Sequence, residues 1–223
     1  MRTRPHAFGI PWAAVLAAAI PAAAGAQEDP DAAVTGGTVP PGWSVRLDRG
    51  DANPRHVRVV AMGDGLHVTL GPAIILYRDA DRASGTYRIA ATFTQTKPAR
   101  HPEAYGLFIG GADLQGDGLR YTYFLVRQDG KFLVKRRLGR ETPTLVPWRE
   151  HPAVKPVPEG GSATNELAIA VGPDRVRFYA NGTEVAALPR TDVDTDGTYG
   201  YRVNHNLDVH LGPIRVERAA RGP

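Results

Sequence analysis

Aromatic and planar hydrogen-bonding side chains recur along the chain in a pattern that is suited to binding sugars. Flat aromatic rings pack against the apolar face of a pyranose ring, and Arg, Asn and Asp groups hydrogen-bond to its hydroxyls. In the segment YRVNHN, residues 201–206, the side chains of Arg202 and Asn204 share one face of an expected strand. The candidate carbohydrate-binding residues are Tyr121, Tyr123, Arg127, Trp148, Arg202 and Asn204.

These residue types also have structural roles that need no ligand. A tyrosine on a strand is often a half-buried packing residue, and a tryptophan after a proline, as at Trp148, can close the edge of a sandwich. A polar strand face can simply be solvated. The sequence leaves these alternatives open at each candidate position.

The segment DVDTDG, residues 192–197, could hold a cation. Asp192, Asp194 and Asp196 alternate before a glycine, as oxygen ligands of Ca²⁺ do, and they are the candidate metal ligands. An EF-hand is excluded because Val203 stands at the twelfth position, where a bidentate Glu is needed. A polar turn without metal is the alternative. No histidine pair has metal-ligand spacing backed by a carboxylate, so the sequence requires no cofactor, and Ca²⁺ is the one candidate.

These residues lie on short apolar segments that are separated by turn signals. Asn181-Gly182 between two alternating runs is the strongest short hairpin signal, and Asp129-Gly130 divides RYTYFLVRQDGKFLVKRR, residues 120–137, in the same way. No helix-period segment occurs after residue 26. The pattern therefore predicts an all-β fold, an antiparallel two-sheet β-sandwich. The long connection rich in Pro and Gly at residues 138–164 is expected to be a loop packed down on this sandwich.

The hairpin at residues 120–137 is apolar on both faces. Tyr121, Tyr123 and Arg127 share one face, and Phe124 lies on the other. We expect the Phe124 face in the core and the tyrosine face on an outer, concave surface. A two-residue turn would pair Arg127 with Phe132, whereas a bulged three-residue turn shifts the pairing by one, and the sequence leaves both registers open.

The chain divides into a leader and one domain. A basic start, an Ala-rich apolar run and a small-residue cleavage site make residues 1–26 a predicted signal peptide. We expect a flexible lead-in over residues 27–41, a single domain over 42–218 and a tail over 219–223. No other run is long enough to span a bilayer. The mature protein is expected to be exported, periplasmic or extracellular, and monomeric.

Composition excludes several functions. The chain has no cysteine, which excludes a Cys nucleophile, Cys-ligated zinc and iron–sulfur clusters. The net charge of +4 includes Arg2 and Arg4, and residues 1–26 contain none of the 23 acidic residues, so cleavage lowers the charge to +2. Because only residues 135–140 form a basic cluster, we expect no nucleic acid partner.

Four segments together resemble a known superfamily. They are YGLFIGGADL, YTYFLVRQDGKFLVKRR, LVPWREHPAV and NELAIAVGPDRVRFYANGTEVAAL, in that order. In this order they resemble the jelly-roll domains of the concanavalin A-like lectin/glucanase superfamily. They are similar above all to exported bacterial domains of the laminin-G-like and 3-keto-disaccharide hydrolase type. The resemblance covers about residues 43–216 and implies a jelly-roll sandwich, with Ca²⁺ often held in its loops.

The resemblance does not extend to the catalytic motif of the superfamily's glucanases. That motif, E-x-D-x-x-E on one strand, is absent here, since Glu166 is followed by Ala168 and Ala170. A hydrolase with Asp113, Glu150 or His205 at a loop-built site stays open.

Three functions follow as hypotheses. The first is an exported carbohydrate-binding domain that is non-catalytic or accessory. The second is a hydrolase-like enzyme acting on a modified, 3-keto disaccharide. The third is an interaction module of the cell envelope.

Overall fold

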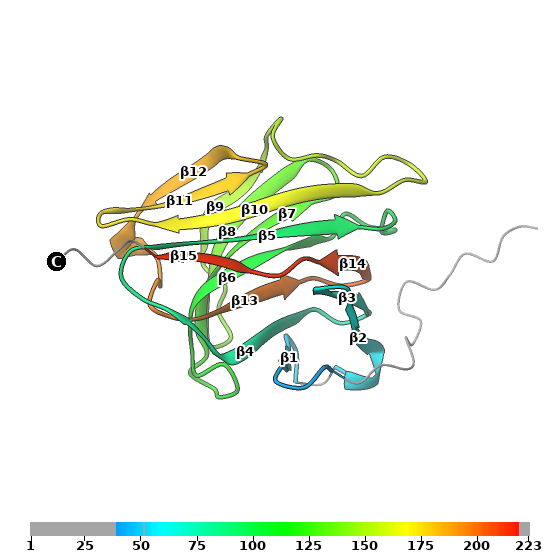
Figure 1. Cartoon of the computed structure of the whole chain (residues 1–223), viewed down its shortest axis with the longest axis horizontal. Helices are drawn as coiled ribbons and strands as arrows, with labels where there is room; N and C mark the ends of the chain where they lie inside the picture. The colour runs from blue at the N-terminus through cyan, green and yellow to red at the C-terminus, as the bar shows by residue number, and fades with distance from the viewer. Residues whose placement is uncertain (1–38, 51, 219–223) are drawn as a thin grey trace, which may run out of the picture.

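The computed structural model describes residues 39–50 and 52–218, which form two antiparallel sheets facing each other (Figure 1). The predicted signal peptide, most of the lead-in and the tail lie outside the described residues. The strands are β1 (Ser44–Leu47), β2 (Val57–Met62), β3 (Gly65–Leu70), β4 (Ile74–Ala83), β5 (Tyr87–Gln95), β6 (Ala104–Ala112), β7 (Arg120–Arg127), β8 (Lys131–Leu138), β9 (Thr144–Glu150), β10 (Ala163–Val171), β11 (Arg175–Ala180), β12 (Thr183–Pro189), β13 (Gly197–Val203), β14 (Leu207–Leu211) and β15 (Arg215–Arg218). Two short 3₁₀ helices, η1 (Pro54–His56) and η2 (Arg190–Asp192), complete the described elements.

The strand order confirms the predicted sandwich. One sheet has seven strands in the order β1-β4-β13-β6-β7-β8-β9, and the other has the order β12-β11-β10-β5-β14-β3-β2, with β15 paired to β5 beyond β14. Figure 1 shows β10, β5 and β15 in front of β7, β8 and β6. None of the helices in the described residues has the length and apolar character needed to cross a bilayer.

The predicted turns form where the sequence signals them. Asn181 and Gly182 have φ angles of +49° and +80°, as a type I′ turn requires. The β7–β8 turn has three residues, and it pairs Arg127 with Lys131 rather than with Phe132. The bulged register is therefore the one adopted, with Gly130 at φ +80°.

The core lies between the sheets and is built from alternate strand residues. Phe124 and Val126 of β7 are buried there, facing residues such as Phe178 of the other sheet, as expected for that side of the hairpin. Tyr121, Tyr123 and Arg127 project from the opposite face of β7, as predicted.

The seven-stranded sheet is strongly curved. β1 and β8 stand five positions apart in the strand order, which would separate them by about 24 Å in a flat sheet. Asp48 directly follows β1, and its backbone N–H donates to the carbonyl of Ala73, the residue before β4, at 2.9 Å. The Asp48 carboxylate nevertheless accepts a hydrogen bond of 2.9 Å from Nη1 of Arg137 on β8. The outer face is therefore concave, and side chains from its two sides meet across it.

The concave face carries an apolar cluster of its own. Its buried members come from β4, β6, β7, β8 and the β6–β7 loop: Ile75, Tyr77, Ala104, Phe108, Leu114, Leu119, Tyr121, Tyr123, Leu125 and Leu133. The β6–β7 loop is fixed above the face because the Leu114 carbonyl accepts from Arg46 and the Gln115 amide donates to the Tyr77 hydroxyl.

The long Pro-rich connection after β8 differs from the sequence expectation. It was expected to be a loop, but residues 144–150 form the edge strand β9. Pro147 is tolerated because an edge strand has one unpaired side. The segment after β9 packs down as expected, with Val154 buried, and the Asn181 amide donates to the Ala153 carbonyl at 2.7 Å.

Candidate functional site

The concave face is not the open aromatic surface that the sequence predicted. Tyr121 is 2% exposed, Tyr123 is 6% exposed and Arg202 is 6% exposed. The curvature of the sheet explains this burial, because side chains from β1, β8 and the β6–β7 loop close over the tyrosines. The two tyrosine rings are tilted by 50° to each other at a centroid distance of 5.6 Å, and the Arg202 guanidinium lies over the Tyr123 ring at 5.6 Å. The expectation that these rings are free to contact a ligand is therefore wrong.

A buried ion cluster holds this arrangement together. Nη1 and Nη2 of Arg202 donate to the two carboxylate oxygens of Asp48 at 2.9 and 3.0 Å. Nη1 of Arg137 donates to the same carboxylate, and Nη1 of Arg202 also reaches the Tyr121 hydroxyl at 3.3 Å. Such charge-assisted and bidentate bonds are the strongest polar contacts in proteins. Asp48 thus links β1, β8 and β13.

The electrostatics keep Asp48 ionised. Burial alone would raise the pKa of the Asp48 carboxyl, but the hydrogen bond and charge of Arg202, with the charges of Arg137 and His205, hold it below its usual value. The carboxylate stays negative at neutral pH and accepts hydrogen bonds.

Asp48 also lines a pocket of about 300 Å³ at one end of the sandwich. The walls come from the segment between β1 and η1, from the β3–β4 turn and from the β13–β14 turn. The lining residues are Asp48, Arg49, Ala52, Asn53, His56, Gly71, Pro72, Ala73 and His205. The pocket therefore combines a fixed carboxylate with amide and imidazole groups, which are hydrogen-bonding partners for hydroxyls.

From this pocket, polar groups continue along the same end of the seven-stranded sheet. Nδ1 of His205 lies 3.9 Å from the Glu103 carboxylate, and this contact raises the pKa of His205 against the opposing effect of burial. The hydrogen bond to Asp129 raises the pKa of Arg127, and the charges of Asp129 and Glu103 add to that effect. The Arg127 guanidinium lies 4.5 Å from the centre of the Trp148 ring.

The strand register explains why these residues share one end of the sheet. Ala104, next to Glu103, is paired with Arg127 across β6 and β7, and its carbonyl accepts from the Asn204 N–H. β13, β7 and β9 all finish at this end, where β6 begins. We call Asp48, His205, Glu103, Arg127 and Trp148 the end row. Trp148 is 37% exposed, and Arg127 covers one face of its ring.

Two of the predicted residues each have a buried polar atom without a partner. Nε of Arg202 and Oδ1 of Asn204 are buried without a hydrogen-bond partner. Most buried polar atoms in proteins are paired. The predicted set is thus divided: Arg127 and Trp148 lie at the surface, Arg202 binds the pocket residue Asp48, Asn204 directly precedes the pocket residue His205, and the tyrosines lie within the concave face.

The three aspartates of the predicted calcium loop do not converge. Asp194 makes a bidentate pair with Arg136 at 2.9 and 3.1 Å, and Asp196 pairs with Arg190 at 3.2 Å. Asp192 accepts from the neighbouring Thr191 hydroxyl. In residues 39–50 and 52–218, no three His, Asp or Glu side chains come together as metal ligands. The geometry therefore gives the predicted Ca²⁺ site no support.

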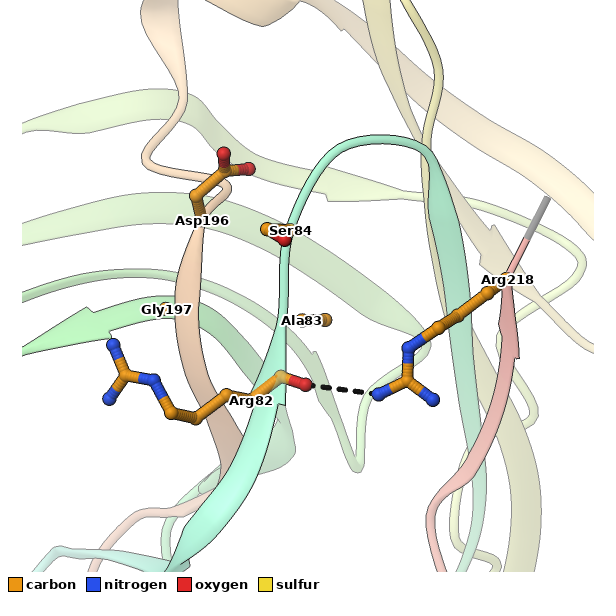
Figure 2. Close-up of a pocket in the computed structure, with 6 residues that line it drawn as sticks. All are labelled: Arg82, Ala83, Ser84, Asp196, Gly197 and Arg218. Atoms are coloured by element: carbon orange, nitrogen blue, oxygen red, sulfur yellow. Dashed lines mark hydrogen bonds between the residues drawn. The ribbon is translucent and has the colours of Figure 1, made fainter. Parts of the chain in front are cut away.

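A second pocket lies at the opposite end of β4 and β13, lined by Arg82, Ala83, Ser84, Asp196, Gly197 and Arg218 (Figure 2). Nη2 of Arg218 donates to the Arg82 carbonyl at 3.1 Å, whereas the Arg82 side chain points away from Arg218. The Arg82 guanidinium donates to the Thr198 hydroxyl instead. Because the two cations do not converge, this pocket is a poorer candidate than the end row.

Sequence reasoning missed Asp48, Arg137 and Glu103. Asp48 lies in VRLDRG and Glu103 in HPEAYG, and neither segment has a recognisable motif. The one usable signal was the polar run at residues 204–206, between two strands. The hydrolase candidates Asp113 and Glu150 lie apart from the pocket. The Asp113 carboxylate accepts from the Gly118 N–H within the β6–β7 loop, and Glu150 ends β9.

Comparison with known proteins identifies the fold. No family model matches the chain, and no curated protein matches it. Solved structures do match: the carbohydrate-binding module CBM66 from Bacillus subtilis has a TM-score of 0.57 at 12% identity, over 79% of this chain and 95% of that one. The mixed-linkage glucan GH16 from Bacteroides ovatus, solved with a G4G4G3G product, has a TM-score of 0.54 at 9% identity, over 78% and 94%. The carbohydrate recognition domain of Emp46p has a TM-score of 0.53 at 8% identity, over 81% and 89%. At these identities the likeness concerns the fold alone, and the chain has the fold of a two-sheet jelly-roll sandwich.

Proposed function

We propose that this protein is an exported, non-catalytic carbohydrate-binding domain whose ligand lies along the end row. The observation that carries the proposal is the row itself, which runs from a pocket with a fixed carboxylate at Asp48 to an exposed aromatic ring at Trp148. The matching structures named for carbohydrate-binding domains support it. The leader-like sequence of residues 1–26 supports export.

Each part of the row matches one feature of a sugar. The free face of the Trp148 ring offers a flat apolar surface for a pyranose, while Arg127 holds the other face. Asp48 accepts hydrogen bonds from hydroxyls, and its three guanidinium bonds fix it in place before a ligand arrives. Asn53 and His205 add donors and acceptors at the pocket wall. Because Asp48 is already ordered, binding costs little side-chain entropy there.

The state of Asp48 favours binding over hydrolysis. Hydrolysis of a glycoside needs one carboxyl group that stays protonated and a second that is ionised across the bond being cut. Asp48 has its pKa lowered, and Glu103 is engaged with His205. Asp48 therefore lacks the surroundings of a general acid.

The test uses the chain from residue 27 onward on a glycan array, followed by calorimetric titration with the strongest ligand. Trp148→Ala should weaken binding about tenfold, or about 1.4 kcal/mol, which is the upper part of the range for an aromatic contact. His205→Ala should weaken binding as well, since it removes a pocket wall.

Tyr179→Ala is the matched control. Tyr179 also packs against an arginine, Arg88 at 6.0 Å, but on the eight-stranded sheet away from the end row. Its loss should leave sugar affinity unchanged. Absence of affinity for every glycan would contradict the proposal, and so would binding that survives both Trp148→Ala and His205→Ala. Release of sugar from an oxidised disaccharide would contradict the proposed binding function and favour the hydrolase-like enzyme instead.

A further inference from the structure

Two histidines face each other on the outer surface of the eight-stranded sheet. His210 of β14 is paired directly with His67 of β3. The flanking residues Val209 and Val68 are buried in the core, so both imidazoles lie on the outward face. Directly opposed residues of an antiparallel pair have Cβ atoms about 4.5–5.5 Å apart. Side-chain rotation alone can therefore bring the two rings onto one ion.

A carboxylate orients the first of these rings. Nε2 of His67 lies 3.1 Å from Oδ1 of Asp208, the residue two positions before His210. Asp208 is itself held by the hydroxyls of Thr69, at 3.3 Å, and of Thr96. With Nε2–H donating to Asp208, neutral His67 carries its lone pair on Nδ1. A metal-binding histidine usually donates its other ring nitrogen to a carboxylate in this way.

The remaining nitrogens lack partners. Nδ1 of His67 and Nδ1 of His210 are both buried without a hydrogen bond. Leaving such atoms unpaired costs about 1–3 kcal/mol each, so a group that satisfies both would be stabilising. The neighbouring Thr94 hydroxyl does not satisfy these nitrogens, because it is hydrogen-bonded to the Thr164 hydroxyl at 2.8 Å.

We propose that His67 and His210 bind a divalent transition-metal ion, with Asp208 as the positioning residue that orients His67. Imidazole nitrogen suits Cu²⁺, Ni²⁺ and Zn²⁺, and Cu²⁺ should bind most tightly of the three. The protein supplies two ligands, and water supplies the others. The site is independent of the end row, which lies on the other sheet.

The test uses tag-free protein treated with a chelator and then titrated separately with CuCl₂, NiCl₂, ZnCl₂ and MgCl₂ by calorimetry. One equivalent should bind for each of the first three ions, and none for Mg²⁺, which prefers oxygen ligands. His67→Asn and His210→Asn should each abolish that equivalent. Asp208→Asn should weaken it about 10–100-fold. His101→Asn is the control, since His101 is exposed in a loop, and it should bind as the wild type does.

A second measurement does not depend on the variants folding. In the wild-type protein, ¹⁵N imidazole spectra should show the ring-nitrogen signals of both His67 and His210 moving on addition of Zn²⁺. The proposal is overturned if no ion binds, if either histidine variant retains the full equivalent, or if only the signals of His56 and His205 move. Glycan affinity should be the same with and without metal, which separates this result from the fate of the proposed function.

Discussion

Neutralising Asp48 should destabilise the protein strongly, because two buried cations depend on it. Asp48→Asn keeps the shape of the side chain but removes the charge that balances Arg202 and Arg137. Arg202 and Arg137 are both largely buried, and their three bonds to the carboxylate are 2.9–3.0 Å long. An asparagine side chain has no negative charge and accepts hydrogen bonds only through Oδ1, so it cannot replace the carboxylate in all three bonds.

The size of the effect follows from burial. Breaking a buried ion pair from one side costs about 3–5 kcal/mol. The Asp48 side chain is 22% exposed, so water can enter, and we expect the lower end, about 3 kcal/mol. For a domain of this size that corresponds to a fall of about 6–12 °C in Tm. Glu217→Gln removes an exposed partner of Arg88 at 3.7 Å and should cost less than about 1 kcal/mol.

The assay is chemical denaturation of both variants across pH, with the double variant Asp48→Asn/Arg202→Met as a cycle. The folded pKa of Asp48 is below its unfolded value, so its stabilising contribution is present above about pH 4 and is lost as the pH falls through the folded pKa. The difference in unfolding free energy between the wild type and Asp48→Asn should therefore become smaller at acidic pH. The double variant should lose less unfolding free energy than the two single variants lose together. A loss below about 1 kcal/mol, or a gap that is independent of pH, would refute the reasoning.

Three further predictions concern other parts of the molecule. In an NMR titration the pKa of His205 should lie above its ordinary value because of the hydrogen bond with Glu103. The contribution of His205 to stability is therefore present at low pH and is lost as the pH rises through the folded pKa. Glu103→Gln should lower the pKa of His205, and an unchanged titration would contradict the contact. Gly110→Ala should prevent folding, because φ is +67° and the new Cβ would lie 2.2 Å from the Asp194 carbonyl oxygen. Gly85→Ala has a similar φ of +71° but open space around it, and it should cost only about 1–2 kcal/mol by thermal denaturation. Similar losses in the two variants would show that the close approach to Asp194 is unimportant. Asn181→Ala removes bonds to Ala153, Asn165 and Glu166 and should cost about 1–3 kcal/mol while exposing residues 151–162 to proteolysis, and unchanged cleavage would argue against the anchoring role.

The sandwich could be predicted because its signals are local. The alternating runs and the Asn181-Gly182 turn determine strands and hairpins, and the two faces of β7 were assigned correctly. Strand β9 was missed because it is an edge strand: its exposed residues and Pro147 read as loop, and one-sided pairing tolerates both.

The burial of the tyrosines could not be predicted because it depends on curvature. Which face Tyr121 occupies follows from its neighbours in sequence, but whether that face is open depends on Asp48 reaching Arg137 across five strand positions. Similarly, His67 and His210 are far apart in sequence, and only the pairing of β3 with β14 brings them together. Long-range contacts of this kind leave no periodic trace.

The positions of β13 and β14 within their sheets affect how the chain can assemble. β13 lies between β4 and β6 in its sheet, and β14 lies between β5 and β3. Until residues 197–211 have left the ribosome, the earlier strands can form only separate pieces, such as the β1–β4 and β2–β3 pairs. Both layers therefore close in a late, cooperative step, and a nascent chain paused before Gly197 would still be digested by a protease that spares the finished protein.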